Sequence, residues 1–361
     1  MLGDFLLDFL LDPEVTHLNH GGYGACPRAV LEECRRWQLE LERSPTEFLA
    51  RRLDGLLRDS RAALAGFVGA RVDDLVFVPN ATSALNAVLR SLRFEAGGEV
   101  LTTTHEYGAI LRTLEFVGAD VVLCEPDELV ARIGPRTRAV LVSHVTSPTA
   151  LVLPVEELCA AARAAGALAI VDGAHAPGHV PLDLEAVGAD VYAGNCHKWL
   201  CAPKGSGFLW ARPEHHGWIE PLVVSWGYGE DADFGERHGW QGTRDPAAYL
   251  AVTTAIEAHA AFDLGRMGAL ADEAELRLSD LGLRRIAGRA APFMRAVVLP
   301  GGDPEELGRR LFDEHRIEVP VYEWEGRTLL RVSVGPYTEE ADLDRLVDAL
   351  RALGAASHVG G

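Results

Sequence analysis

Short apolar runs alternate with longer stretches of helical periodicity through the first two thirds of the chain. Most of these runs are apolar at consecutive positions, which is typical of strands that are buried on both faces of a sheet. The helical stretches between them predict an α/β fold with a mostly parallel sheet of about seven strands, covered by helices on both sides. The expected strands are residues 75–79, 100–104, 121–125, 138–144, 167–172, 189–194 and 207–211.

The pattern changes after residue 246. A long alanine-rich helical stretch reaches about residue 282, and a strand-like run, a helix, two further strand-like runs and a closing helix follow it. This order predicts a smaller α+β domain at residues 251–361, after a large α/β domain at residues 16–250. The boundary is soft, because no low-complexity linker separates the two parts.

The first residues, MLGDFLLDFLLDPE, are apolar but carry Asp4, Asp8 and Asp12 at four-residue spacing. No basic region precedes them, so the pattern fits neither a signal peptide nor a membrane span. It predicts an amphipathic helix within a segment of residues 1–15, which packs on the small domain or on a partner subunit.

The chain of 361 residues has a formal net charge of -19, and no basic stripe offsets it. Such a surface argues against nucleic acid and anionic membranes as partners. The six cysteines include no C-x-x-C pair, so the sequence indicates neither a zinc site nor a disulfide framework. We therefore expect a reduced, cytoplasmic protein without a metal site.

Only two lysines occur in the chain, Lys198 and Lys204, and both lie in the stretch GNCHKWLCAPKG. Arginine can replace lysine as a surface charge, but only a neutral primary amine attacks a carbonyl carbon to form an imine. We therefore expect at least one of the two to carry out covalent chemistry. The alternative is that both are turn residues left over from a bias toward arginine codons, and a structural turn is our interpretation of Lys204.

Unusual polar residues follow the expected strands, where ligands bind to open parallel sheets. After the first strand, Ala81 and Thr82 begin a helix whose free N–H groups can bind an anion, although a plain helix cap explains them equally well. Asp172 ends an apolar strand, where an unpaired carboxylate is costly, and His175 follows three residues later. A protonated ring nitrogen on a ligand would pair with Asp172; a cap of the following turn is the alternative.

Two further segments complete this set of polar residues. Asn195, His197 and Lys198 follow the strand at residues 189–194, and Thr243 lies in the loop HGWQGTRDP beside Arg244. A ligand with an anionic group, a protonatable ring nitrogen and an aldehyde for lysine to attack corresponds to pyridoxal phosphate.

At this point a resemblance is apparent. VDGAHAPG followed by GNCHKWLCAPKGSGFLW resembles the class V aminotransferase family of fold-type I pyridoxal-phosphate enzymes, nearest to its isopenicillin N epimerase-like branch. LNHGGYGACP, HVTSPTALVLPVEEL and LRVSVGPYTEEADLDRL fit the same branch, so the resemblance spans roughly residues 15–350.

The resemblance implies roles for individual residues. Lys198 would form the imine with pyridoxal phosphate and later move the α-proton of the substrate, while Asp172 would pair with the ring nitrogen and His175 would lie near the ring hydroxyl. Tyr107 would cover the ring face, with His105 as the alternative. The residues expected to hold the phosphate are Ala81, Thr82, Asn195, His197 and, from a neighbouring subunit, Thr243.

The expected contribution of Thr243 from a neighbouring subunit implies a homodimer with shared active sites. Arg331 would bind the substrate carboxylate, with a salt bridge inside the small domain as the alternative. Asn19 and His20 are candidate substrate contacts, although a tight turn explains them nearly as well. The aromatic and histidine-rich segment 213–240 is expected to form an active-site wall or a dimer contact.

The sequence differs from the cysteine desulfurases of this class at two points that bear on the expected reaction. No cysteine follows Cys201, so persulfide chemistry on a mobile loop is disfavoured, and Ser147 stands where desulfurases carry an Asn. We expect an enzyme of secondary metabolism that removes the α-proton of an amino acid and acts as a carbon-sulfur β-lyase or an epimerase. An aminotransferase, an oxidative or decarboxylating enzyme, and a non-catalytic partner protein with the same fold are the alternatives.

Overall fold

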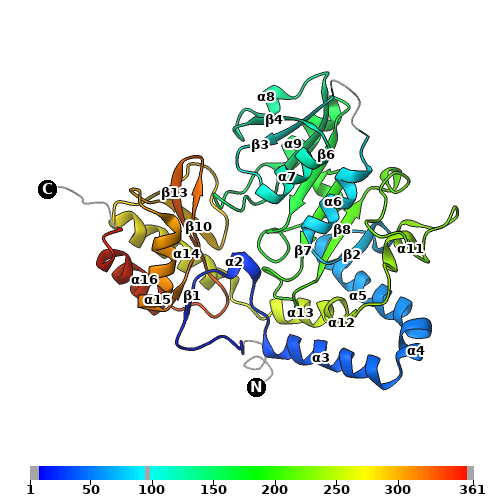
Figure 1. The fold of residues 1–361 in the computed structure, drawn as a ribbon, viewed down its shortest axis with the longest axis horizontal. Coiled ribbons are helices and arrows are strands. Elements are labelled where there is room, and N and C mark those ends of the chain that lie inside the picture. Colours follow the sequence, from blue (N-terminus) through cyan, green and yellow to red (C-terminus); the bar gives the residue numbers. More distant parts are fainter. Residues whose placement is uncertain (1–7, 94–97, 356–361) are drawn as a thin grey trace.

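The computed structural model describes residues 8–93 and 98–355. The chain forms a large lobe around one sheet and a small lobe around another, with α2 (His20–Tyr23) lying between them (Figure 1). The first half of the amphipathic helix expected at the N-terminus falls on residues 1–7, outside the described residues. Residues 8–14 are not helical, because Phe9 pairs with Pro27 in an isolated bridge, so this part of the prediction is wrong. None of the described helices is both long and apolar enough to cross a lipid bilayer.

The sheet of the large lobe has seven strands in the order β2-β8-β7-β6-β5-β3-β4. Neighbouring strands from β7 to β4 are parallel, whereas β8 runs antiparallel to both β7 and β2. The predicted mostly parallel sheet of about seven strands is confirmed. Its strands are β2 (Leu75–Val78), β3 (Glu99–Thr103), β4 (Asp120–Cys124), β5 (Thr137–Ser143), β6 (Leu168–Gly173), β7 (Val191–Asn195) and β8 (Gly207–Ala211).

Helices cover both faces of this sheet, and side chains alternate between the two faces along each strand. In β2, Leu75 and Phe77 join the core beneath α5 (Leu53–Val68), α9 (Val155–Ala164) and α13 (Val252–His259). Val76 and Val78 point the other way, into the core beneath α6 (Ala81–Ser91) and α7 (Gly108–Phe116). This two-sided burial explains why the strands are apolar at consecutive positions.

Shorter elements surround the large lobe. In Figure 1, α3 runs along its lower edge below α12 and α13, which α3 contacts. The elements are α3 (Arg28–Arg43), α4 (Pro45–Glu47), the π-helical segment η1 (Phe48–Arg52), the 3-10 turns η2 (Val72–Asp74) and η3 (Pro213–His215), α8 (Leu129–Arg132), α10 (Leu184–Val187), α11 (Phe234–Gly239) and α12 (Ala247–Leu250).

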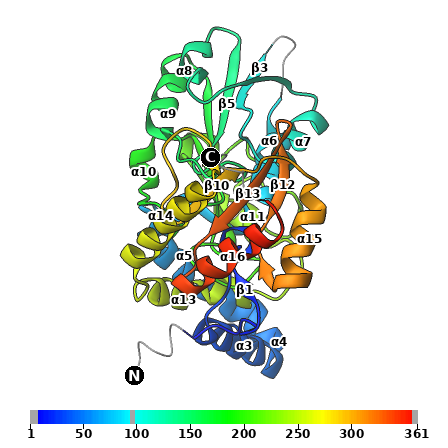
Figure 2. The same cartoon turned by 90° about the vertical axis from the view of Figure 1, so that its left-hand side faces the viewer.

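The small lobe has a four-stranded antiparallel sheet in the order β12-β13-β10-β9, with three helices packed on it (Figure 2). A separate parallel pair joins β1 (Thr16–His17) to β11 (Ile317–Glu318), so the chain just before α2 lies on this lobe. The remaining elements are α14 (Leu264–Asp280), β9 (Arg284–Arg285), β10 (Met294–Val298), α15 (Pro304–His315), β12 (Val321–Trp324), β13 (Arg327–Ser333) and α16 (Glu340–Ala352).

Candidate active site

The carboxyl ends of neighbouring strands bring the predicted polar residues together. Ser143 ends β5 and is the register partner of Asp172 on β6, and Gly173 is in turn paired with Gly194 on β7. Asn195 then ends β7, three residues before Lys198. The parallel pairing therefore places the carboxylate and the lysine segment at one edge of the sheet, as expected for a doubly wound fold.

Lys198 is half-buried in the turn that follows β7. Its Nζ lies 2.9 Å from Nε2 of His175, and its carbonyl oxygen accepts a hydrogen bond from Nε2 of His20 at 3.1 Å. Burial lowers the pKa of Lys198 to about 7; the nearby guanidinium of Arg331 lowers it further, and Asp172 opposes the shift. A substantial fraction of Lys198 is therefore a neutral amine near pH 7, as imine formation requires.

Asp172 is 4% exposed, and its Oδ1 accepts a hydrogen bond from the backbone N–H of Ala174 at 2.9 Å. No ion pair joins it to another residue in the part of the chain that the structure describes. Burial raises its pKa, because an ionised carboxylate without a cation is unfavourable in this environment. A cationic ligand group beside Asp172 would remove this penalty.

The start of α6 is only partly free to bind an anion. The N–H of Ala81 donates to Oδ1 of Asn195 at 2.8 Å, and the N–H of Ser83 donates to Oδ1 of Asn80 at 2.9 Å. Asn195 thus positions the helix and occupies the Ala81 N–H that was expected to hold an anion. The N–H of Thr82, between them, has no hydrogen-bond acceptor among the described residues.

One ring nitrogen of His197 is hydrogen-bonded to the backbone. Its Nδ1 donates to the carbonyl oxygen of Ser206 at 3.0 Å, and burial lowers its pKa to about 4. The ring is therefore neutral, with Nε2 left as an acceptor. Thr243 is exposed in the loop after α11 and makes no hydrogen bond with the site of its own chain.

Arg331 reaches the site from β13 of the small lobe. Its Nη1 donates to the carbonyl oxygen of Ser147 at 2.6 Å and to the Ser147 hydroxyl at 3.1 Å, while its buried Nε has no partner. Its positive charge lies close enough to lower the pKa of both Lys198 and His175. The alternative of a salt bridge within the small lobe does not occur among the described residues.

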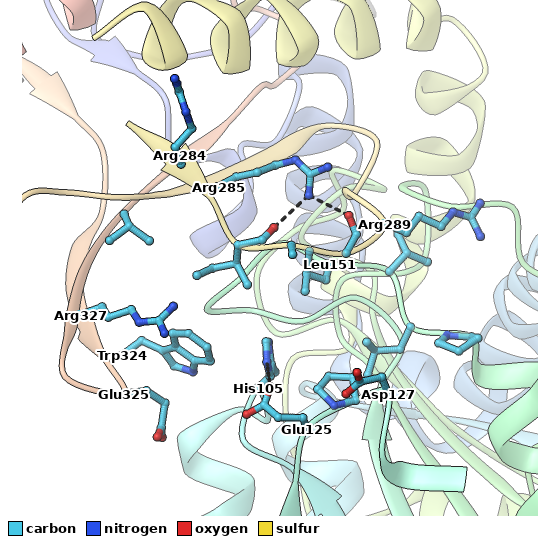
Figure 3. A pocket seen from close by; sticks show the side chains of 18 residues that line it. His105, Glu125, Asp127, Leu151, Arg284, Arg285, Arg289, Trp324, Glu325 and Arg327 are labelled. Atoms are coloured by element: carbon cyan, nitrogen blue, oxygen red, sulfur yellow. Dashed lines mark hydrogen bonds and ion pairs between the residues drawn. The ribbon is translucent and has the colours of Figure 1, made fainter. Parts of the chain in front are cut away.

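Tyr107 and His105 point to different places although they are almost adjacent. Tyr107 caps α7 and its side chain is 46% exposed. His105 instead bonds Thr149 through Nδ1 at 2.7 Å and Glu125 through Nε2 at 3.2 Å, on the floor of a separate cleft of about 1170 Å³ (Figure 3). The geometry favours Tyr107 over His105 as the residue that faces a ligand at the strand ends.

His20 and Asn19 have less access to a ligand than the sequence indicated. His20 has no exposed surface: it contacts the Tyr337 hydroxyl with Nδ1 at 3.2 Å and the Lys198 carbonyl with Nε2. Asn19 donates to Glu318 at 3.3 Å, and its buried Oδ1 has no partner. Both residues tie the N-terminal turn to the lysine segment or the small lobe, so this placement does not favour the expected substrate contact by His20.

Three residues at the site were not identified from the sequence: Glu106, Ser143 and Trp199. Glu106 is buried, and its Oε1 accepts hydrogen bonds from the Ser143 hydroxyl and from the Tyr107 N–H, the latter at 2.8 Å. Burial, and then the nearby Asp172, raise the pKa of Glu106 to about 8. The sequence shows a glutamate immediately before Tyr107, but that it is buried depends on packing between strands and could not be predicted from this segment.

Lys204 and the segment 213–240 lie outside the group of residues at the strand ends. Nζ of Lys204 donates to the carbonyl oxygen of Gly24 at 2.9 Å, which ties two turns together. The segment 213–240 carries a group of exposed apolar side chains, namely Leu222, Val223, Val224, Trp226 and Tyr228.

Comparison with known proteins agrees with this geometry. A model of the aminotransferase class-V family matches residues 25–346. Isopenicillin N epimerase of Streptomyces clavuligerus is 38% identical over 385 residues, which cover 95% of this chain and 96% of that protein. A probable chloroplastic L-cysteine desulfhydrase of Arabidopsis thaliana is 30% identical, over 95% of this chain and 83% of that protein.

Solved structures show the same fold. The apo structure of a cysteine desulfurase from Thermococcus onnurineus superposes with a TM-score of 0.84 at 22% identity, over 97% of each chain. The resemblance noted in the sequence is confirmed, and so is the fold-type I architecture with its smaller second domain. The chain belongs to the aminotransferase class-V family of pyridoxal-phosphate-dependent enzymes.

Proposed function

We propose that this chain removes the α-proton of an amino acid and returns a proton to the opposite face, as an epimerase. The observation that carries this proposal is the placement of Lys198, a half-buried amine whose Nζ lies 2.9 Å from His175 and whose pKa is lowered to about 7. Tyr107 is exposed and its N–H bonds to Glu106, the buried carboxylate near Asp172. The similarity to isopenicillin N epimerase over nearly the whole length of both chains supports the same reaction class.

The residues present fit pyridoxal phosphate. Asp172 is a buried carboxylate that forms no ion pair with any described residue. The Thr82 N–H is a donor without a described acceptor at a helix start, and the pKa of Lys198 is lowered to about 7. When bound, the cofactor supplies an aldehyde that captures amino groups and a protonated ring that withdraws electrons from the α-carbon. Asp172 would hold the ring nitrogen in its protonated form, and His175 would donate to the ring hydroxyl.

The phosphate would be held at the start of α6. Thr82 offers its backbone N–H there, and His197 would offer Nε2 after taking up a proton, which a phosphate dianion favours. Asn195 would act mainly by fixing the first residue of this helix through its bond to Ala81.

Arg331 would bind the substrate carboxylate. Its buried guanidinium still has an unpaired Nε–H, and Arg suits the planar carboxylate because it donates two parallel hydrogen bonds. Ser147, which already contacts Arg331, would hold the guanidinium in place when no substrate is bound.

Proton movement would use the two faces of the bound substrate. Nζ of Lys198 would take the α-proton on one face, and the Tyr107 hydroxyl would donate on the other. His105 is committed to Thr149 and Glu125 in the neighbouring cleft, and His20 is enclosed behind Lys198. Among the residues considered from the sequence, Tyr107 is therefore the second acid that the geometry leaves available.

Elimination of a β-thiol, as a carbon-sulfur lyase, is the second candidate. It requires only Lys198 as base, and the 30% identical desulfhydrase relative favours it. Transfer of sulfur through a protein cysteine is not supported, since five of the six cysteines are buried and Cys34 is half-buried.

A homodimer would complete the site. A partner subunit would bury the exposed apolar side chains at residues 222–228. The exposed Thr243 follows this segment in the sequence and would contribute to the phosphate site of that subunit. Six free cysteines support a cytoplasmic location, and the similarity to isopenicillin N epimerase supports a role in secondary metabolism.

Incubation of the loaded enzyme with L-amino acids in heavy water tests the proposal. Deuterium at the α-carbon together with inversion of configuration is the expected result. Pyruvate and a free thiol without an inverted amino acid would instead establish the lyase. Absence of any exchange across amino acids and cysteine conjugates would refute α-proton chemistry altogether.

A further inference from the structure

A chain of hydrogen bonds connects three side chains behind the candidate active site. Nε1 of Trp199 donates to Nδ1 of His175 at 3.3 Å, and Nε2 of His175 lies 2.9 Å from Nζ of Lys198. Trp199 and His175 are each 2% exposed, so water does not compete for the bond between them.

The direction of the first bond determines the direction of the second. The indole N–H of Trp199 can only donate, so Nδ1 of His175 must be an acceptor and carry no proton. In a neutral imidazole the proton is then on Nε2, which donates to Lys198. Nζ of Lys198 has to accept this bond, and only an uncharged amine has the lone pair to do so.

An ammonium at Lys198 would conflict with this arrangement. It would need Nε2 of His175 as an acceptor, which would move the imidazole proton to Nδ1 and set it against the indole N–H. Two donors facing each other in a buried site cost about the energy of an unsatisfied polar group. The pairing therefore favours the neutral amine through hydrogen-bond direction, in addition to burial.

Trp199 is fixed by its surroundings. Its ring stacks on His179 at 4.0 Å between centroids, and it packs on Phe293 of the small lobe at 5.8 Å. Nδ1 of His179 donates to the carbonyl oxygen of His175, while its Nε2 accepts from the N–H of Phe293, both at 3.0 Å. The indole therefore cannot turn away from His175 without breaking this packing.

We propose that Trp199 is a positioning residue that fixes the tautomer of His175 and thereby keeps Lys198 in its reactive, uncharged form. This inference rests on the proposed function of Lys198 as the residue that captures the cofactor. Other titratable and charged groups lie near these three side chains. Asp172 and Arg331 also shift the pKa of Lys198, and Arg331, His179 and His197 also lower the pKa of His175. The test has to separate their influence from that of Trp199.

The two lysines of the chain allow a direct measurement. The cofactor-free full chain is treated with trace acetic anhydride over a range of pH, and mass spectrometry gives the acetylated fraction of Lys198 and Lys204 in the same sample. Only an uncharged amine reacts, so the midpoint of each curve reports that lysine's ionisation. Trp199→Phe should raise the Lys198 midpoint by about one pH unit, roughly the effect of one hydrogen bond, and leave the Lys204 midpoint unchanged.

The His175→Phe background separates a tautomer effect from a packing effect. Phenylalanine neither donates nor accepts a hydrogen bond through a side-chain N or O, so it cannot pass the direction of the Trp199 bond on to Lys198. Adding Trp199→Phe to His175→Phe should move the Lys198 midpoint by less than about 0.3 pH unit. The proposal is overturned if Trp199→Phe leaves the midpoint unchanged in the wild-type background, or raises it equally in both backgrounds.

If Trp199→Phe does not fold, the wild type decides the question. Long-range proton–nitrogen spectra of protein labelled at histidine, with His175 assigned by its loss in His175→Gln, should show the proton on Nε2. A proton on Nδ1 would overturn the proposal. These measurements need no cofactor, so failure of the wild type to bind pyridoxal phosphate would refute the proposed function separately.

Discussion

Gly24 lies directly against His197, so closely that a Cβ on Gly24 would overlap the His197 carbonyl oxygen. The contact joins the N-terminal turn to the residue before Lys198. Gly24 also has φ 71° and ψ 165°, a backbone conformation that is essentially confined to glycine. Glycine at this position therefore allows the N-terminal turn to close behind the active-site lysine.

Gly24→Ala should weaken both folding and cofactor binding. Gly118 is the control for a positive φ alone, because its φ is 70° and a Cβ there would have no neighbour within 4 Å. In urea unfolding, Gly118→Ala should lose about 1–2 kcal/mol and keep its affinity for pyridoxal phosphate. Gly24→Ala should lose more, with an affinity at least about tenfold weaker. Equal behaviour of the two variants would show that the contact is unimportant.

Glu106→Gln should make the stability of the cofactor-free chain less sensitive to pH. Burial and Asp172 raise the pKa of Glu106 from 4.5 to about 8, so the folded state binds a proton that the unfolded state has lost. Its contribution to stability is full below about pH 4.5 and is lost as pH rises through about 8. The melting temperature of Glu106→Gln relative to wild type should therefore increase from pH 5 to pH 9.

Glu115→Gln, an exposed change on α7, is the control and should show a constant difference over this range. A pH-independent difference for Glu106→Gln as well would mean that Glu106 is ionised throughout.

Tyr107→Phe should separate epimerisation from proton exchange. Removing the hydroxyl takes away the proposed acid on one face, whereas Lys198 still exchanges the α-proton on the other. Inversion should fall by about 100-fold or more, with wash-in of deuterium from heavy water largely retained. His105→Gln, in the neighbouring cleft, should retain both activities. Normal inversion by Tyr107→Phe would assign the second acid to another residue.

Arg331→Gln should raise KM for the amino acid by about tenfold to 100-fold, which corresponds to the loss of charge-assisted hydrogen bonds. Arg327 begins the same strand, but it is exposed and lines the separate cleft (Figure 3). Arg327→Gln should leave KM within about twofold of the wild type. The carboxylate assignment fails if KM is unchanged in Arg331→Gln and the loss appears only in kcat.

The sequence allowed most of the large lobe to be predicted, because its strands are buried on both faces and are apolar throughout. Asp172 and Lys198 were also identifiable, since a carboxylate at the end of an apolar strand and a rare lysine are both conspicuous. The pairing of β1 with β11, about 300 residues apart, left no local signal. It depends on the N-terminal segment packing on a lobe that is otherwise built from the end of the chain.

Hydrogen-bond direction could not be inferred from residue types. Ala81 and Asn195 were both expected to face the phosphate, yet they bond to each other. His20 is of a type that often contacts substrate, but packing encloses it behind Lys198. Glu106 and Trp199 gain their importance from neighbours on other strands and turns, Ser143 and His175, which no single segment reveals.

The most direct test of the account is to locate the cofactor on the chain. The protein is loaded with pyridoxal phosphate, reduced with borohydride to fix the imine, digested and analysed by mass spectrometry. The account predicts one cofactor per chain, attached to Lys198 alone, and no attachment in Lys198→Ala. Attachment to Lys204, or a reduced protein without bound cofactor, would contradict it.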